Sequence, residues 1–282
     1  MRFFSGCLCS AVLLLPLSMA QAGEGKLQET AGVTQIEGSA GGGLVPWAVL
    51  AGYDSRDEVS MSAYSTRVSV DDFRLYAFGA ALSFYDRVEL SVARQTFDLI
   101  DTPYEINQNI LGVKARLYGD VIYSAWPQVS VGIQYKELKD ELLAGLVGAE
   151  DSDNGTDFYL AASKAHLGAF FGYNLFWDLT LRGTKANQFG LLGYGGANND
   201  SYEIMAEGSL AILLSRKLAI GVEYRQKPDN LPGLEEEDAM DMFLAYIPNR
   251  HFNLTAAWVD LGTIAGSDPQ SGPYLSLTGY LW

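Results

Sequence analysis

The chain ends with GPYLSLTGYLW (residues 272–282), in which apolar and polar side chains alternate almost to the final Trp282. Successive side chains of a β-strand point to opposite faces, so Leu275 and Leu277 share one face and Ser276 and Thr278 the other. The last residues of a soluble domain usually fray and are polar. This ending therefore predicts a terminal strand that is held in a sheet along its whole length.

The same alternation recurs along the chain. In RVELSVARQTF (87–97), Leu90 and Val92 lie opposite Glu89 and Ser91, and PQVSVGIQYK (127–136) and KLAIGVEYRQ (217–226) follow the same pattern. A period of two with one apolar and one polar face is typical of strands. After the N-terminal region no run approaches the roughly 20 apolar residues of a membrane-spanning helix. With 30 glycines and 16 tyrosines, the composition favours an all-β fold.

The lengths of the connections decide which all-β fold is expected. Short turns, near 85–87, 119–127, 170–174, 215–217 and 248–250, alternate with longer polar links, near 98–106, 139–154, 187–200, 228–237 and 261–271. Transmembrane β-barrels have short periplasmic turns and longer outer loops. A soluble β-sandwich predicts neither this alternation nor the aromatic ending.

We therefore predict a single antiparallel transmembrane β-barrel of about twelve strands, with fourteen as the alternative. The stretch VSMSAYSTRVS (59–69) fits least well, either as an extension of the first hairpin or as part of two further strands. The expected strands are 44–54, 72–85, 87–97, 107–118, 128–138, 155–167, 175–186, 201–214, 217–227, 238–247, 251–260 and 272–282.

The N-terminal region divides into two parts. Residues 1–22 have a basic start, an apolar core and a small-residue ending, and we interpret them as a secretory signal peptide. Both cysteines, Cys7 and Cys9, would leave with it, so no disulfide is expected. Residues 23–43 are either a periplasmic tail or a plug that enters the lumen with Glu37 near its basic wall. The barrel is expected to span 44–282.

Charge and composition restrict the partners. The net charge of −15 makes nucleic acid an unlikely ligand. Outer-membrane lipid and lipopolysaccharide are the expected surroundings. Aromatic residues cluster near the predicted periplasmic turns, where such rings suit the lipid headgroup interface.

Strand parity predicts which charged side chains line the lumen. The basic ones are Lys114, Arg116, Lys136, Arg182 and Arg225. The acidic ones are Glu89, Asp178, Glu203, Glu207, Glu223 and Asp241. Opposed charged walls either line a water-filled pore or pair across the lumen and close it.

No catalytic, metal or cofactor site is predicted. Ser163 and His166 are close in sequence, but strand parity places them on opposite faces. EDSDNGTD (150–157) has its glycine one position too early for an EF-hand calcium loop.

The ending Tyr280-Leu281-Trp282 resembles the C-terminal signal of bacterial outer-membrane proteins, although Ser276 and Thr278 stand where apolar residues are usual. The resemblance implies the barrel assembly machinery as a partner.

EGSAGGGLVPWAVLAGYD (37–54), RVELSVARQTFDL (87–99) and TKANQFGLLGYGG (184–196) are similar to the proteobacterial outer-membrane family DUF3034. The resemblance implies an outer-membrane location in a Gram-negative bacterium and brings no known activity.

The first functional hypothesis is a channel for passive transport of small polar solutes. The alternative is a closed structural or binding module with acidic surface loops. A lipid-modifying outer-membrane enzyme is the least favoured hypothesis, because no Ser/His/acid set shares a face.

Overall fold

The structure is a computed structural model, and it describes residues 31–100, 102–151 and 153–281. The predicted signal peptide, the first part of segment 23–43 and Trp282 lie outside these residues.

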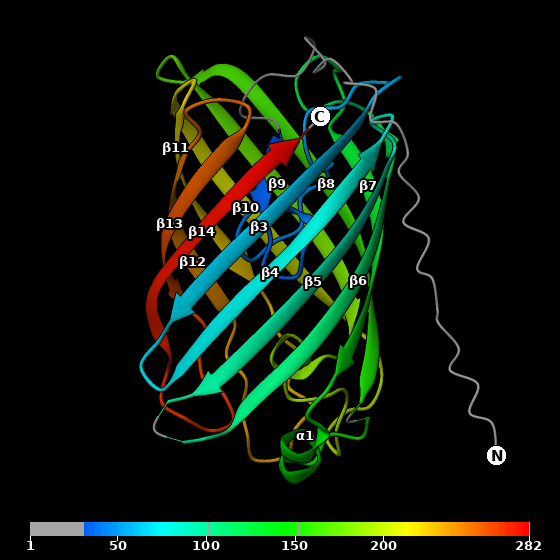
Figure 1. Cartoon of the computed structure of the whole chain (residues 1–282), viewed down its shortest axis with the longest axis vertical. Helices are drawn as coiled ribbons and strands as arrows, with labels where there is room; N and C mark the ends of the chain where they lie inside the picture. Colours follow the sequence, from blue (N-terminus) through cyan, green and yellow to red (C-terminus); the bar gives the residue numbers. More distant parts are fainter. Residues whose placement is uncertain (1–30, 101, 152, 282) are drawn as a thin grey trace, which may run out of the picture.

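Twelve antiparallel strands form one closed barrel (Figure 1). The last strand pairs with the first, for example at Leu277–Ser65, so the sheet has no free edge. The predicted fold and strand number are confirmed, and the fourteen-strand alternative is wrong. The strands are β3 (Val59–Ser69), β4 (Phe73–Phe84), β5 (Val88–Leu99), β6 (Glu105–Tyr118), β7 (Gln128–Leu138), β8 (Asn154–Phe170), β9 (Tyr173–Thr184), β10 (Glu203–Ser215), β11 (Leu218–Arg225), β12 (Ala239–Tyr246), β13 (Phe252–Asp260) and β14 (Ser271–Leu281).

The predicted first strand is wrong. Residues 44–54 lie inside the barrel, and β3, over 59–69, is the strand that closes the wall. Residues 44–54 contain Pro46 and apolar side chains of both parities, which suits a segment buried on all sides. In β3, Ser60, Ser62 and Thr66 face the lumen, while the outward face is only weakly apolar. That weak contrast explains why the strand is inconspicuous in the sequence.

The two ends of the barrel differ as predicted (Figure 1). The long-loop end, at the bottom of the figure, carries connections 100–104, 139–153, 185–202, 226–238 and 261–270. These include the helix α1 (Glu141–Val147) and the 3₁₀ turn η2 (Asn187–Gly190). The short-turn end carries connections 85–87, 119–127, 171–172, 216–217 and 247–251. One connection departs from the prediction, because residues 70–72 join β3 to β4 by a short turn at the long-loop end.

The outer surface of the wall is apolar and the inner surface polar. On β5, Leu90 and Val92 are 44% and 51% exposed, whereas Glu89 and Ser91, which alternate with them, are 1% and 5% exposed. An outward apolar band of this kind suits hydrocarbon, in which a closed sheet leaves no backbone group unpaired. None of the helices in the described part of the chain is long and apolar enough to cross a membrane.

Aromatic side chains surround the short-turn end, as the turn positions predict. Phe176 and Tyr280 also lie on strands near this end, but their side chains are buried and face the lumen. The exposed aromatic residues at this end are Tyr85, Tyr118, Tyr123, Trp126, Phe170, Phe171, Tyr173, Tyr246 and Phe252.

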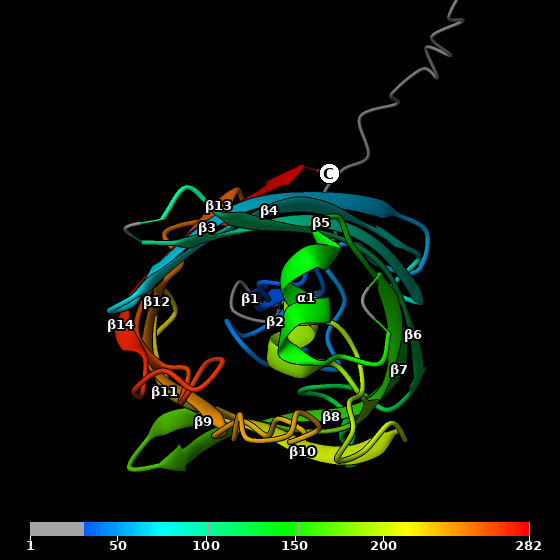
Figure 2. The same cartoon turned by 90° about the horizontal axis from the view of Figure 1, so that it is seen from below.

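Residues 31–58, called here the luminal segment, precede β3, and residues 31–54 of this segment lie inside the barrel (Figure 2). Two short strands, β1 (Val33–Thr34) and β2 (Ala40–Gly41), pair with each other and with no wall strand. Every residue from 31 to 54 is buried. The interior of the barrel is thus filled by a separate piece of the chain.

Candidate functional site: the filled, charged lumen

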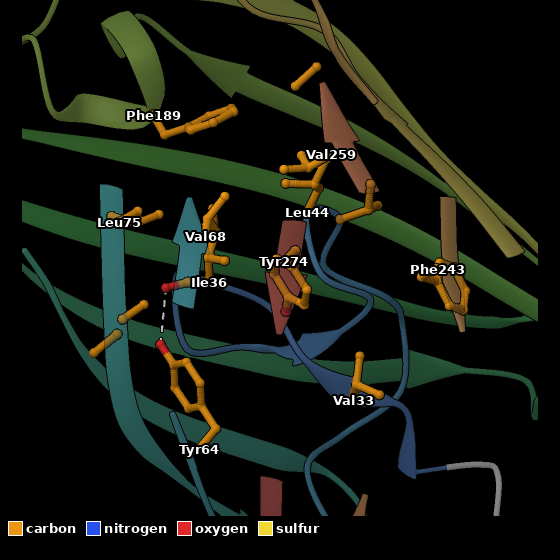
Figure 3. Close-up of a cluster of buried hydrophobic side chains, with 14 of the residues drawn as sticks. Val33, Ile36, Leu44, Tyr64, Val68, Leu75, Phe189, Phe243, Val259 and Tyr274 are labelled. Carbon is orange, nitrogen blue, oxygen red and sulfur yellow. Dashed lines mark hydrogen bonds between the residues drawn. The ribbon is translucent and has the colours of Figure 1, made fainter. Parts of the chain in front are cut away.

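The luminal segment packs against an apolar part of the inner wall. Figure 3 shows Val33, Ile36 and Leu44 among side chains of several wall strands. The Tyr64 hydroxyl on β3 and the Gln95 amide on β5 both donate to the Ile36 carbonyl, each at 3.0 Å. The wall therefore holds the segment by apolar contact and by polar side chains that reach its backbone.

The three glycines at 41–43 allow the segment to pass close to the wall. A β-carbon at position 42 would lie 1.7 Å from a carboxylate oxygen of Glu223 on β11. One at position 43 would lie 3.3 Å from carboxylate Oδ2 of Asp241 and from the hydroxyl of Tyr274. A side chain at position 42 would therefore displace the Glu223 carboxylate, and glycine there allows close approach to the acidic side of the lumen.

The basic side of the lumen surrounds one carboxylate, that of Glu37. Arg225 on β11 binds it through two nitrogens, Nη1 to Oε2 at 3.0 Å and Nη2 to Oε1 at 3.1 Å. Lys136 on β7 donates to the same carboxylate, and Nη1 of Arg182 on β9 lies 3.6 Å from it. All four side chains are at most 3% exposed.

Two wall carboxylates complete this group. Asp157 on β8 lies 2.7 Å from Nζ of Lys136 and 3.2 Å from Nη1 of Arg182. Glu207 on β10 pairs with Arg182 and lies 3.4 Å from Nε of Arg225. We call these six side chains the Glu37 cluster; buried charges of this kind require such partners. Its members are Glu37, Lys136, Asp157, Arg182, Glu207 and Arg225.

A second buried ion pair of the wall binds the luminal segment at two places, near Ala40 and at residues 49–51. Glu89 on β5 and Lys114 on β6 are ladder partners. Oε1 of Glu89 accepts from the Ala40 N–H at 3.1 Å, and Oε2 accepts from the Ala51 N–H at 2.8 Å. Lys114 Nζ donates to the Ala40 carbonyl at 2.7 Å and to that of Val49 at 2.9 Å. We call this pair the Glu89–Lys114 clamp.

Two more predicted acidic residues bind backbone N–H groups of the segment. Asp178 on β9 accepts from the Ala48 N–H at 3.2 Å, and Glu223 accepts from the Leu44 N–H at 2.7 Å. Asp241 is buried beside Glu223, its ladder partner, and its carboxylate oxygens have no hydrogen-bond partner among the described residues.

Two predicted lumen residues lie away from this centre. Arg116 is at the short-turn end, where it pairs with Asp86 and Asp120. Glu203 is half-buried at the long-loop end and accepts from Asn199. Neither touches the luminal segment in the contacts of the described residues. The strand parity of both is nevertheless inward, so parity alone does not show how deep in the lumen a residue lies.

Asp157 is the wall residue of the Glu37 cluster that the sequence interpretation missed. It lies at the end of an acidic loop run, which obscured its place on a strand. Asp157 is an even number of residues from Tyr159 and Ser163 on β8, so strand parity places it on the same inward face. This pattern could have identified it from the sequence.

The connection 185–202 folds inward and covers the lumen from the long-loop end. Phe189 in η2 lies over the Arg225 guanidinium at 4.2 Å. Glu236 accepts from the Gln188 N–H at 2.9 Å, and Lys227 Nζ donates to the Gln188 side chain at 2.8 Å. Burial raises the pKa of Glu236 to about 7, although Lys227 nearby opposes this, and burial lowers the pKa of Lys227.

The short-turn half of the lumen contains an apolar region besides the Glu89–Lys114 clamp. An apolar cavity there is lined by side chains from the luminal segment and from the wall. Among them, the Trp47 ring lies 4.5 Å from that of Phe176, and its Nε1 donates to Ser209 at 2.7 Å. The luminal segment thus contacts both charged and apolar regions of the inner wall.

Ser163 and His166 remain apart, as the parity of β8 predicts. Ser163 donates to Asp178 inside the barrel, whereas His166 is exposed outside and accepts from the Trp177 indole at 3.1 Å. Among the described residues, no group of three or more His, Cys, Asp or Glu side chains is placed to hold a metal ion.

Comparison with known proteins gives a family but no function. The family described as "Protein of unknown function (DUF3034)" matches residues 30–278. The comparison with curated proteins found no match.

Several solved outer-membrane proteins have a similar barrel. The KdgM porin is 10% identical, with a TM-score of 0.47, over 78% of this chain and 98% of that one. The NanC porin is 9% identical, with a TM-score of 0.49, over 79% and 99%. The COG4313 outer membrane channel from Pseudomonas putida F1 is 12% identical, with a TM-score of 0.43, over 79% and 94%. With TM-scores below 0.5 and identities this low, these likenesses carry no conclusion about this chain.

Proposed function

The chain belongs to the DUF3034 family, and we propose that it is an outer-membrane conduit for small polar solutes that its own luminal segment closes. The closed sheet with its outward apolar band supports a place in the outer membrane. The polar inner wall supports passage of polar solutes once the lumen is empty.

One observation carries the proposal. The luminal segment forms a sheet of its own, and the ladder of the twelve wall strands is complete without it. Residues 31–54 make no backbone–backbone hydrogen bond to the wall in the described part of the chain. The segment can therefore leave without breaking any backbone pairing of the barrel, and the filled state is the closed state of the conduit.

Conductance in planar lipid bilayers tests this directly. A chain beginning at Gly23 is expected to be closed most of the time, whereas the same chain lacking residues 31–54 should conduct steadily. Retained heat-modifiable migration shows that the shortened barrel is folded. A folded but silent deletion variant contradicts the proposal.

A matched control uses the outer surface of α1. Leu142 and Leu146 are 68% and 72% exposed, so replacing both with alanine leaves the lumen untouched. This variant should stay closed like the parent chain.

The same exposed residues favour a second candidate, a closed barrel that binds a partner at its long-loop end. Leu142 and Leu146 lie on α1 at this end, and the acidic stretch 234–238 belongs to another connection there. In that case the parent chain and the deletion variant are both silent, and the α1 control loses the binding of the partner.

A further inference from the structure

The Glu37 carboxylate occupies a position that the wall itself builds. Five neighbouring wall strands, β7 to β11, each contribute one charged side chain to the Glu37 cluster. Glu37 is the member that comes from the luminal segment. Its departure would therefore leave the other five side chains in place on the barrel.

The charges of these five do not balance. Lys136, Arg182 and Arg225 are cationic, while Asp157 and Glu207 are the wall carboxylates paired with them. The wall group alone has one excess positive charge, which Glu37 neutralises in the filled state. In the emptied lumen water reaches these side chains, and their excess positive charge attracts an anion.

The donors are arranged for a carboxylate. Arg225 presents two nitrogens to the two oxygens of Glu37, the fork geometry that suits planar carboxylates. Gln35, also from the luminal segment, donates to Oε2 of Glu37 at 2.7 Å. The Gln134 side chain of the wall contacts both Gln35 and Arg182. When the segment leaves, Gln134 loses a partner and is free to bind a polar group beside the carboxylate.

We propose that Glu37 is an internal stand-in for the solute, and that Lys136, Arg182 and Arg225 bind the carboxylate of a small organic acid in the open barrel. This inference rests on the proposed conduit and names its solute class. The luminal segment closes the lumen and occupies the recognition site in one step. A solute carboxylate competes with Glu37 for the same donors.

Chemical rescue of Glu37→Ala tests the site without any measurement of transport. In chloride, the variant should unfold at a lower temperature than the parent chain, because the excess positive charge is uncompensated. Acetate or glycolate at the same ionic strength should raise Tm back toward that of the parent, whereas neutral acetamide should not. Equal rescue by acetamide, or no rescue by either acid, overturns the inference.

Arg225→Met in the Glu37→Ala background is the matched control. It removes the excess charge together with the forked donor, so the response to acetate should disappear. If Glu37→Ala does not fold, the same titration is made on the chain lacking 31–54, with and without Arg225→Met. A Tm that acetate leaves unchanged in that folded chain also overturns the inference.

The experiments distinguish failure of the proposed conduit from failure of the proposed carboxylate site. If the deletion variant conducts but acetate neither stabilises it nor reduces its current, the conduit stands and the carboxylate site is refuted. If acetate stabilises a deletion variant that never conducts, the site stands and the conduit is refuted.

Discussion

Breaking the Glu89–Lys114 clamp should release the luminal segment. Glu89→Leu removes the acceptor of two backbone N–H groups and leaves the Lys114 ammonium buried without its carboxylate, which lies 3.5 Å away. Removing one member of a buried ion pair typically costs about 3–5 kcal/mol. At about 1.4 kcal/mol per tenfold change, the undocked population should rise by roughly two to three and a half orders of magnitude.

Cysteine labelling measures this population. A chain that begins at Gly23 contains no cysteine, so Val45→Cys introduces a single thiol at a position that is 0% exposed. When redocking is fast, the rate of maleimide labelling follows the undocked fraction. Val92→Ala, on the lipid-facing side of the same strand as Glu89, should leave the labelling rate unchanged.

The double variant Glu89→Leu/Lys114→Leu distinguishes a charge effect from simple loss of contacts. In the double variant neither charge is buried without its partner. The increase in its labelling rate over the parent chain should therefore be well below the product of the increases in the two single variants. The reasoning is refuted if Glu89→Leu labels at the rate of the parent chain, or if the two single effects multiply in the double variant.

Three further outcomes are expected. Burial raises the pKa of Glu236 from its ordinary 4.5 to about 7 in the folded protein. The stability that this side chain contributes to the connection 185–202 is therefore fully present below about pH 4.5 and is lost as the pH rises through 7. Hydrogen exchange of residues 187–192, corrected for intrinsic rates, should therefore lose protection between pH 5 and 8, and Glu236→Gln should remove this dependence. Trp47→Ala should weaken docking of the segment by about 3–5 kcal/mol, measured by the same labelling at position 45, and an unchanged rate contradicts this. Leu179→Arg, at an outward position that is 64% exposed, should destabilise folding into lipid vesicles by about 2–4 kcal/mol, and an unchanged urea midpoint argues against a lipid-facing position.

Strand parity is informative from sequence because it is local. The alternation in 87–97 places Glu89 inside and Leu90 outside without knowledge of any partner, and connection lengths give the strand number. The prediction of the first strand was wrong for a physical reason. Residues 44–54 are apolar enough to resemble a wall strand, and the outward face of 59–69 is too polar to stand out.

The partners of the lumen residues were not predictable in the same way. Glu37 lies 99 residues from Lys136 and 188 from Arg225 in the chain, and no local pattern connects them. A plug with Glu37 near the basic wall was one of two alternatives for 23–43. The third cation around it, the clamp at Glu89 and the length of the luminal segment depend on how the chain folds back on itself inside the barrel.

The position of the luminal segment also constrains biogenesis. The segment directly precedes β3, and β3 pairs in the finished wall with β14, the last of the described strands in chain order. The luminal segment is therefore synthesised before the described wall strands, and β14 after the other eleven. If the wall closes around a luminal segment that is already in place, the segment does not have to enter a finished barrel. A substitution that weakens the packing of this segment should therefore slow insertion into the membrane as well as increase conductance.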